Sequence, residues 1–339
     1  MEFYEVISKL NTNAENHMFT VCSGEHIGEK MITSSEGTVW MSDKSGYFSI
    51  HSEDVMTAAN NKVTEIDGVK VYSELLGNKD ELVICGAGHV SMPVIDLAKT
   101  LGFRVVAIDD REQFVSNAIK HGADEGICTG FSEALPNIPG SLDTYFVIVT
   151  RGHKYDSDCL LEIVKKPHAY IGMIGSRRKI GMVRDFLIAN DVPEAVIDSV
   201  HMPIGLDIGA ETPEEIAVSI LAEIIGVKNT VKRNSGFSGP LLDALINDGR
   251  GPAVLASIVS KKGSAPRGAG ARMLCGPNGL LAGTIGGGLA EARTLEKAAE
   301  MLSQDSREPF VIQVDMTGQE IEDEGMICGG VIEVLLERV

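Results

Sequence analysis

Three glycine-rich stretches near the C-terminal end combine residue types that could bind an anion. They are "GSAPRGAG" (residues 263–270), "GTIGGG" (283–288) and "GMICGG" (325–330). Glycine leaves backbone N–H groups open to a phosphate or another oxyanion, and Arg267 adds a guanidinium fork. Cys328 adds a sulfur that could act as a nucleophile or bind a soft metal. The alternative is that the glycines serve only hairpin turns and that Cys328 is a small buried hydrophobic side chain.

A second candidate site is the stretch "GAGHVS" (residues 86–91), which follows an apolar run and begins a predicted helix. Gly86 permits a tight turn, and Gly88 lets a phosphate approach the positive end of the helix. The dinucleotide-binding fingerprint has a third glycine, and Ser91 stands in its place here. The acidic end of the next strand would bind a ribose and favours NAD over NADP. The alternative is that the glycines serve strand–helix packing and the acidic residue is solvated. The candidate ligand-binding residues are Gly86, Gly88, His89 and Asp109.

A third candidate lies after the apolar run "AYIGMI", where the sequence continues with Ser176, Arg177 and Arg178. Ser176 is predicted to cap a helix that the two arginines begin, leaving backbone amides for an anion. Arginine is suited to bidentate contact with phosphate. Cations are unfavourable at the positive end of a helix, which favours ligand binding over the alternative of an exposed helix start.

The elements that position these residues follow from the pattern of apolar runs. Residues 79–228 alternate continuous apolar strands with helices, which predicts a Rossmann-like, doubly wound parallel sheet covered on both faces. In its last helix, Thr212 and Glu215 form a predicted capping box around Pro213. Residues 229–239 are polar and glycine-rich and are expected to be a linker. Residues 240–339 are predicted to form a smaller α+β domain, so the fold class is α/β with this second domain at the C-terminus.

The N-terminal segment, residues 1–78, contains an internal similarity to the C-terminal domain. "GEKMITSSEG" (28–37) and "GARMLCGPNG" (270–279) both read Gly-x-basic-Met-aliphatic, then four residues, then Gly. We interpret the segment as a degenerate copy of the first hairpin of residues 240–339. Chance similarity of two hairpins is an equal alternative, because short matches beside turns are common.

Composition limits the class of protein and its partners. The chain has 339 residues, a formal net charge of −18 and a pI near 4.9, which argues against nucleic acid and anionic membranes as partners. No apolar run is long enough to span a bilayer, and "MEFYEVISKL" does not resemble a signal peptide. The six cysteines form no CxxC pair, so we expect a reduced, cytoplasmic protein without a metal site or a disulfide framework.

The longer motifs resemble one known family. "GSAPRGAGARML", "GTIGGGLAEA" and "ICGGVIEVLLE" resemble the XdhC/CoxI domain, and "VICGAGHV", "YIGMIGSRRK" and "PIGLDIGAETPEEIAVSILAEI" resemble the Rossmann-type domain of the same proteins. The resemblance covers about residues 66–339. It implies an accessory factor that binds the molybdenum cofactor (molybdopterin), supports its sulfuration with a cysteine desulfurase and delivers it to an apo xanthine dehydrogenase-type molybdenum hydroxylase. The implied cofactor-handling residues are Gly263, Ser264, Arg267, Gly286, Gly287, Gly288, Cys328, Gly329 and Gly330.

Two features depart from that family pattern. The XdhC/CoxI domain commonly precedes the Rossmann-type domain, and here the order is reversed, so we expect a homodimer to restore the arrangement of the sites. Leu289 stands where a cysteine often follows the glycines, which leaves Cys328 as the candidate thiol for sulfur handling. We expect a non-catalytic carrier rather than an enzyme, because no clear set of catalytic residues stands beside the Rossmann-type turn. The alternatives are an NAD(P)-dependent oxidoreductase, with His153 or Asp207 as acid or base, and a nucleotide-sensing module.

Overall fold

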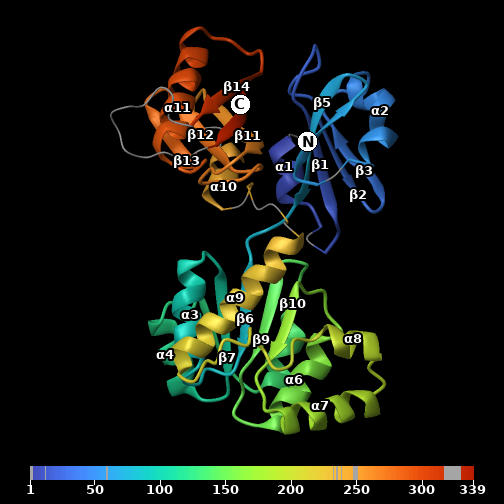
Figure 1. Ribbon diagram of the computed structural model, residues 1–339, viewed down its shortest axis with the longest axis vertical. Helices are drawn as coiled ribbons and strands as arrows, with labels where there is room; N and C mark the ends of the chain where they lie inside the picture. The colour runs from blue at the N-terminus through green and yellow to red at the C-terminus, as the bar shows by residue number, and fades with distance from the viewer. Residues whose placement is uncertain are drawn as a thin grey trace. The chain divides into compact units, whose positions relative to one another are not determined.

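The computed structural model describes residues 3–11, 13–58, 60–231, 233, 236–237, 239–246, 251–316 and 330–339. The chain divides into two compact units (Figure 1). Unit 1 comprises Met1–Asn78 and Arg233–Val339, and unit 2 comprises Lys79–Lys232. No helix in the described ranges is long and apolar enough to cross a membrane.

Unit 2 contains a five-stranded sheet whose paired strands all run parallel, in the order β10-β9-β6-β7-β8. The strands are β6 (Glu81–Cys85), β7 (Arg104–Asp109), β8 (Glu125–Cys128), β9 (Thr144–Ile148) and β10 (Tyr170–Met173). The helices are α3 (Ser91–Thr100), α4 (Glu112–Lys120), α5 (Phe131–Ala134), the short 3-10 helix η1 (Leu135–Asn137), α6 (His153–Ile163), α7 (Arg177–Ala189), α8 (Glu194–Ser199) and α9 (Pro213–Val231). The predicted Rossmann-like sheet is confirmed, and the loops that follow its strands share one edge.

Helices cover both faces of this sheet. Alternate residues of each strand point to opposite faces, so neighbouring residues of one strand belong to different cores. Leu82 and Ile84 of β6 belong to a core shared with α3 and α9, whereas Val83 and Cys85 belong to a core shared with α6 and α7. Every residue of β9 is buried, as a strand covered on both faces requires.

Helix α9 begins as predicted, but it ends later than expected. The backbone N–H of Glu215 donates to Thr212 Oγ1 (3.3 Å) and that of Thr212 donates to Glu215 Oε2 (3.1 Å), which confirms the capping box. The helix continues to Val231, so the first three residues of the expected linker 229–239 are helical. Asn229, Thr230 and Val231 include neither glycine nor proline, so nothing stops the helix there.

Unit 1 contains two five-stranded antiparallel sheets with the same strand order. The first has the order β3-β2-β1-β5-β4 and the second β13-β12-β11-β15-β14. The first sheet comprises β1 (Asn16–Val21), β2 (Lys30–Ser34), β3 (Gly37–Met41), β4 (Lys62–Ile66) and β5 (Val69–Leu76). The second comprises β11 (Val254–Lys262), β12 (Arg272–Gly276), β13 (Gly279–Gly283), β14 (Phe310–Asp315) and β15 (Val331–Arg338). The similarity noted for one hairpin therefore extends to the whole topology of residues 1–78.

The helices of unit 1 occupy matching places in the two halves. They are α1 (Phe3–Ser8), α2 (Tyr47–Val55), α10 (Pro240–Ile246) and α11 (Gly288–Ser303). Figure 1 shows α2 and α11 on opposite sides of the unit, with the sheets between them. Residues of β1 and β2 share a core with α2, and residues of β11, β12 and β15 share a core with α11. The opposite faces of the two sheets pack on each other, together with α1 and α10.

Candidate functional site

The glycine-rich loops of the C-terminal domain lie at one end of its sheet. Residues 263–271 join β11 to β12, residues 284–287 join β13 to α11, and Gly330 directly precedes β15. The backbones approach so closely that side chains would not fit between them. A Cβ atom on Gly330 would lie 2.2 Å from the carbonyl oxygen of Ser264, and one on Gly286 would lie 2.7 Å from Pro266 Cβ. The structure therefore brings parts of all three predicted loops together.

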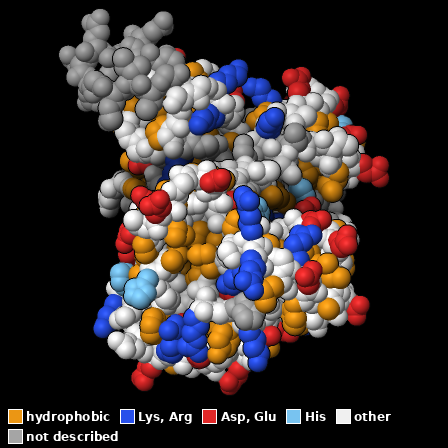
Figure 2. Space-filling view, turned by 60° about the horizontal axis from the view of Figure 1, so that its bottom comes forward, with side chains coloured by type: hydrophobic (Ala, Val, Ile, Leu, Met, Phe, Trp, Pro, Cys, Tyr) orange, Lys and Arg blue, Asp and Glu red, His pale blue; other side chains and the backbone are white. Residues whose placement is uncertain are grey.

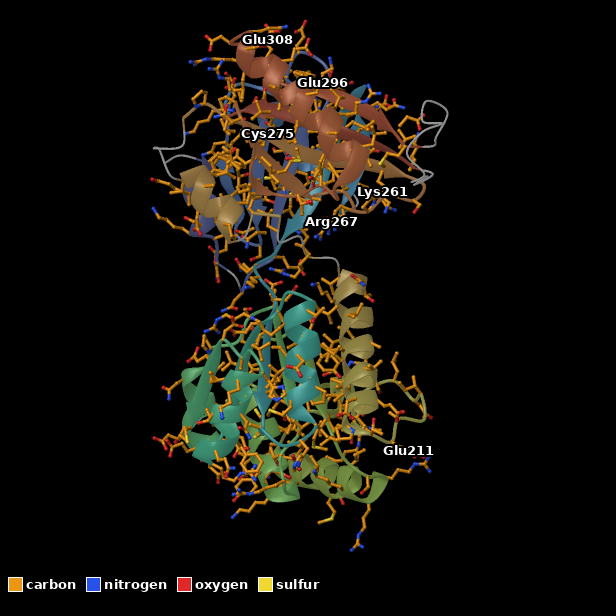
Figure 3. The ribbon with its side chains drawn as sticks, turned by 90° about the vertical axis from the view of Figure 1, so that its left-hand side faces the viewer. Glu211, Lys261, Arg267, Cys275, Glu296 and Glu308 are labelled. Carbon is orange, nitrogen blue, oxygen red and sulfur yellow. The ribbon has the colours of Figure 1, made fainter. Side chains whose placement is uncertain are left out.

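Charged and polar side chains at this end of the sheet are exposed. Gly263, Ser264 and Arg267 are all exposed, and Arg267 makes no hydrogen bond or ion pair with the described part of the chain. Lys261 Nζ donates to the carbonyl of Ala265 (3.1 Å) and so braces the loop that carries Arg267. Figure 3 shows Lys261 and Arg267 at the loop end of the domain and Glu308 at the opposite end.

Two of the predicted residues, Cys328 and Gly329, lie outside the described residues. Cys275 of β12 is a described thiol of the same domain, but it is buried in the core, and burial raises its pKa to about 12. Cys275 is therefore unsuited to act as a nucleophile, because the thiolate is the reactive form. Among the described cysteines, the exposed thiol is that of Cys128, at the end of β8 in unit 2.

A carboxylate that the sequence analysis did not single out already occupies the "GTIGGG" turn. Oε1 of Glu291, in the first turn of α11, accepts hydrogen bonds from Thr284 Oγ1 and from the amides of Ile285 (3.1 Å), Gly286 (3.3 Å) and Gly287 (2.9 Å). The amides of Gly286 and Gly287 are therefore not free to donate to a ligand, contrary to expectation. The signal was present in the sequence, since an acidic residue in the first turn of a helix commonly satisfies the free N–H groups.

These hydrogen bonds govern the ionisation of Glu291. Burial works to raise the pKa of the carboxyl, but the donors from Thr284, Gly287, Ile285 and Gly286 outweigh burial and hold the pKa below its ordinary value. Because the folded pKa is the lower one, this carboxylate stabilises the folded state fully above the ordinary value of 4.5. The stabilisation is lost as pH falls through the folded pKa.

Replacing Glu291 with alanine should lower the free energy of unfolding of unit 1 by about 1–2 kcal/mol, because four donors lose their common acceptor. Trp40 is the single tryptophan of the chain and lies in unit 1, so its fluorescence in urea follows this unit. Glu296→Ala, an exposed change on the same helix (Figure 3), is the matched control and should alter stability by less than about 0.5 kcal/mol. A difference between wild type and Glu291→Ala that persists unchanged to about pH 3 would contradict the proposed role.

The two glycines of the turn after β6 have different surroundings. A Cβ atom on Gly86 would lie 2.6 Å from the carbonyl oxygen of Val149, and the φ of Gly86 is +104°, so packing explains this glycine. A Cβ atom on Gly88 would meet nothing within 4 Å. Ser91 is buried and donates to the carbonyl of Gly86 (2.5 Å), which accounts for serine in the third position of the fingerprint. Packing therefore does not require Gly88, and the exposed His89 lies beside this open space.

Asp109 is not available to a ribose in this arrangement, contrary to the prediction. Its carboxylate is 2% exposed and accepts from the amide of Ala87 (2.9 Å). The guanidinium of Arg111 donates to both carboxylate oxygens, with Nε 2.7 Å from Oδ1 and a terminal nitrogen 2.9 Å from Oδ2. Burial works to raise the pKa of Asp109, but hydrogen bonds from Arg111 and Ala87 lower it overall. The sequence reasoning missed Arg111, although it directly follows the two aspartates.

Further arginines lie at the same edge of the unit 2 sheet. Arg151 donates to Asp110 Oδ2 (2.7 Å), and the guanidinium of Arg111 stacks 3.6 Å from the ring centroid of Phe114. Ser176 accepts from the amide of Lys179 (3.4 Å), which confirms that it caps α7. Arg177 and Arg178 follow it and are exposed. Figure 2, in which the lower part of Figure 1 comes forward, shows groups of Lys and Arg side chains among hydrophobic ones.

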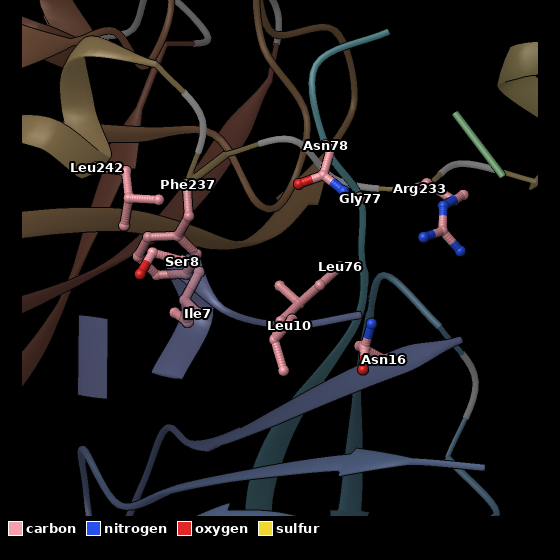
Figure 4. A pocket seen from close by; sticks show the side chains of 10 residues that line it. All are labelled: Ile7, Ser8, Leu10, Asn16, Leu76, Gly77, Asn78, Arg233, Phe237 and Leu242. Atoms are coloured by element: carbon pink, nitrogen blue, oxygen red, sulfur yellow. The ribbon is translucent and has the colours of Figure 1, made fainter. Parts of the chain in front are cut away.

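A small pocket in unit 1 is separate from both glycine-rich sites (Figure 4). Its volume is about 80 Å³. It is lined by Ile7, Ser8, Leu10, Asn16, Leu76, Gly77, Asn78, Arg233, Phe237 and Leu242. None of the predicted ligand-binding residues contributes to it, so it is not part of the candidate site.

The fold and the sites define a class of protein, in which a Rossmann-type domain is combined with an α+β unit that carries converging glycine loops. Two family models match the two parts. The XdhC Rossmann domain matches residues 82–224, and the XdhC and CoxI family matches residues 247–315. Together the matches cover more than half of the chain, and the chain belongs to the XdhC and CoxI family.

Relatives of known sequence or structure resemble parts of the chain. YqeB of Escherichia coli K12 is 34% identical over 168 residues, which are 48% of this chain and 30% of that protein. A probable xanthine dehydrogenase subunit from Bacillus subtilis is 30% identical over 161 residues, 48% of this chain and 47% of that protein. The chain thus spans less than half the length of these curated relatives. A crystal structure of a xanthine dehydrogenase from Bacillus halodurans shares the fold, with a TM-score of 0.52 and 24% identity over 67% of this chain and 65% of that one.

Proposed function

We propose that this protein is an accessory factor for a xanthine dehydrogenase-type molybdenum hydroxylase. In this proposal it binds the molybdenum cofactor at the glycine loops of the C-terminal domain, supports sulfuration of the cofactor together with a cysteine desulfurase, and inserts it into the apo-enzyme. The observation that carries the proposal is the convergence of Ser264, Gly286 and Gly330 beside an exposed Arg267. Family membership supports it, since one of the relatives is a probable xanthine dehydrogenase subunit. We also propose a homodimer.

The residues at the loops fit an anionic cofactor, although they offer it fewer hydrogen-bond donors than the sequence predicts. Arg267 has no partner among the described residues, and Ser264, in the same loop, is exposed as well. The amides at Gly286 and Gly287 serve Glu291 instead, so they shape the site rather than bind the anion. Arg267 would hold the pterin phosphate, and the bound cofactor would supply the molybdenum centre. Cys328 stays the candidate thiol for sulfur handling.

Replacing Arg267 with alanine should weaken binding of the molybdenum cofactor about 10- to 100-fold, because a charge-assisted hydrogen bond to phosphate contributes about 1.5–3 kcal/mol. The measurement is anaerobic titration of the full chain with cofactor released from a purified molybdenum enzyme. Arg307→Ala, which removes an exposed arginine beside Glu308 at the opposite end of the domain, is the matched control and should bind as wild type does. Absence of saturable binding to the wild type would refute the carrier function, and equal binding by both variants would refute the role of Arg267.

A second candidate function is nucleotide binding at the turn after β6, as an NAD(P)-dependent oxidoreductase or a nucleotide sensor would require. The open space over Gly88 favours it, because no packing contact demands a glycine there. Since Asp109 is occupied by Arg111, the edge that a ribose would meet presents arginine rather than a free carboxylate. This reverses the preference for NAD expected from the sequence, because arginine accommodates a 2′-phosphate.

We therefore expect NADP to bind more tightly than NAD, and Arg111→Ala to remove most of that preference. A fall of about tenfold in NADP affinity with little change for NAD corresponds to the loss of one charged contact. Isothermal titration with both dinucleotides measures this. Lys120→Ala, an exposed change at the far end of α4, is the control. Equal affinity of the wild type for NAD and NADP would contradict the role of Arg111.

A further inference from the structure

The two halves of unit 1 match in register as well as in strand order. Thr20 of β1 pairs with Lys30 of β2, and Ser257 of β11 pairs with Arg272 of β12. The next hairpin has an irregularity at the same place in each half, between Ile32 and Thr33 in β2 and between Leu274 and Cys275 in β12. Gly37 and Gly279 then begin β3 and β13 with φ of +118° and +121°. Two unrelated hairpins would not share a bulge at the same residue, because bulges are specific features of a fold.

Ion pairs cross between the two sheets in a reciprocal pattern. Lys30 pairs with Glu337 of β15, and Arg272, its counterpart in register, pairs with Glu74 of β5. The two glutamates are themselves counterparts. Glu74 pairs with the β1 residue two before Thr20, and Glu337 pairs with the β11 residue two before Ser257. A contact of residue i with j that is repeated as j with i is the signature of an isologous two-fold interface.

Equivalent residues also meet each other, which locates the axis of this pseudo-symmetry. Lys70 and Glu333 stand four residues before Glu74 and Glu337 respectively, and Lys70 Nζ lies 3.4 Å from Glu333 Oε1. A residue contacts its own counterpart only next to a two-fold axis. The two halves contribute equivalent positions to the small core beside them. Cys22 is the counterpart of Val259, and Tyr72 is the counterpart of Leu335.

We infer that residues 3–76 are a complete copy of the C-terminal domain that occupies the place of a second subunit. The sheet face of the C-terminal domain is an interface for a domain of its own fold, and this chain fills that interface from within. A homodimer of the chain therefore has to use a different surface. The inference rests on registers and contacts within unit 1 and does not depend on the proposed cofactor.

The copy keeps the interface and has lost the glycine loops. Its β1–β2 connection reads "SGEHIG" (23–28), without the Ser-Ala-Pro-Arg of residues 264–267. Its β3–α2 connection reads "SDKSG" (42–46), where the C-terminal domain has three consecutive glycines. Each chain consequently carries one glycine-loop site, where two identical domains would carry two.

The Lys70–Glu333 pair allows a test on the unmodified full chain, because both side chains are accessible (51% and 29% exposed). A one-to-one mixture of unlabelled and ¹⁵N-labelled protein is unfolded, refolded together and treated with a carbodiimide, which joins a lysine amine to an adjacent carboxylate. Mass spectrometry then shows whether the two peptides of each crosslink carry the same isotope. Lys99 and Asp124 (2.6 Å apart), both within unit 2, are the reference for refolding and for an intrachain link.

We expect the Lys70–Glu333 crosslink to be isotopically uniform, as the Lys99–Asp124 crosslink is. Mixed-isotope peptides making up about half of the Lys70–Glu333 product would show that the copy packs on another chain, and would overturn the inference. Absence of this crosslink while the reference forms would show that the two sheet faces do not pack on each other, which also overturns it.

Discussion

Replacing Arg272 with methionine should lower the free energy of unfolding of unit 1 by about 3–5 kcal/mol, because it leaves a buried carboxylate without its cation. Glu74 is fully buried and the Arg272 side chain is 2% exposed. Arg272 also donates to the carbonyl of Gly270 (3.0 Å) and stacks 3.8 Å from the ring centroid of Phe237. Methionine retains the apolar stem of arginine, so the loss is mainly electrostatic.

The effect is measured by guanidinium unfolding followed through Trp40, which reports on unit 1. Lys297→Met breaks an ion pair with Glu300 that is about half exposed, in the same unit, and should cost less than about 1 kcal/mol. The double variant Arg272→Met, Glu74→Leu should regain most of the stability, because a buried ion pair can be replaced by apolar residues at little cost. If Arg272→Met costs no more than Lys297→Met, the pair does not stabilise the interface between the sheets.

Local patterns were sufficient to predict most of the fold. Continuous apolar strands such as "YFVIVT", followed by helices, defined the parallel sheet of unit 2, because such strands must be covered on both faces. The capping box of Thr212 and Glu215 fixed the start of α9. Ser176 was identified as a helix cap from its position before the two arginines. In each case the determining contacts lie within a few residues along the chain.

What the sequence did not reveal depends on contacts between distant residues or on competition for donors. The Lys30–Glu337 pair joins residues 307 positions apart, so no local pattern indicates it. The N-terminal copy was visible only as one hairpin, because equivalent core positions of the two halves hold different residue types, such as Tyr72 and Leu335. The amides of the "GTIGGG" turn looked available, and three-dimensional proximity decided that Glu291 takes them.

The convergence of the loops leads to the strongest prediction for function. Replacing Gly330 with alanine should weaken binding of the molybdenum cofactor about a hundredfold or more and lower the stability of unit 1 by about 1–3 kcal/mol. Gly330 is buried, and an added Cβ would lie 2.2 Å from the carbonyl oxygen of Ser264 and 2.9 Å from that of Lys262. Both are backbone atoms, so the loop that carries Arg267 has to move. The binding effect exceeds that of Arg267→Ala because the shape of the site and the charged contact change together.

Gly268→Ala, in the β11–β12 loop that Gly330 approaches, provides the matched control for this change. A Cβ on Gly268 would meet nothing within 4 Å, and its φ is not positive, so alanine should leave binding and stability within about 0.5 kcal/mol of wild type. Titration with the cofactor and unfolding followed by Trp40 separate the two effects, because a variant that is folded at the assay temperature can still have lost binding. If Gly330→Ala is folded and binds like Gly268→Ala, then close approach of the β11–β12 loop to Gly330 does not form the cofactor site, and the carrier function has to be sought elsewhere on the chain.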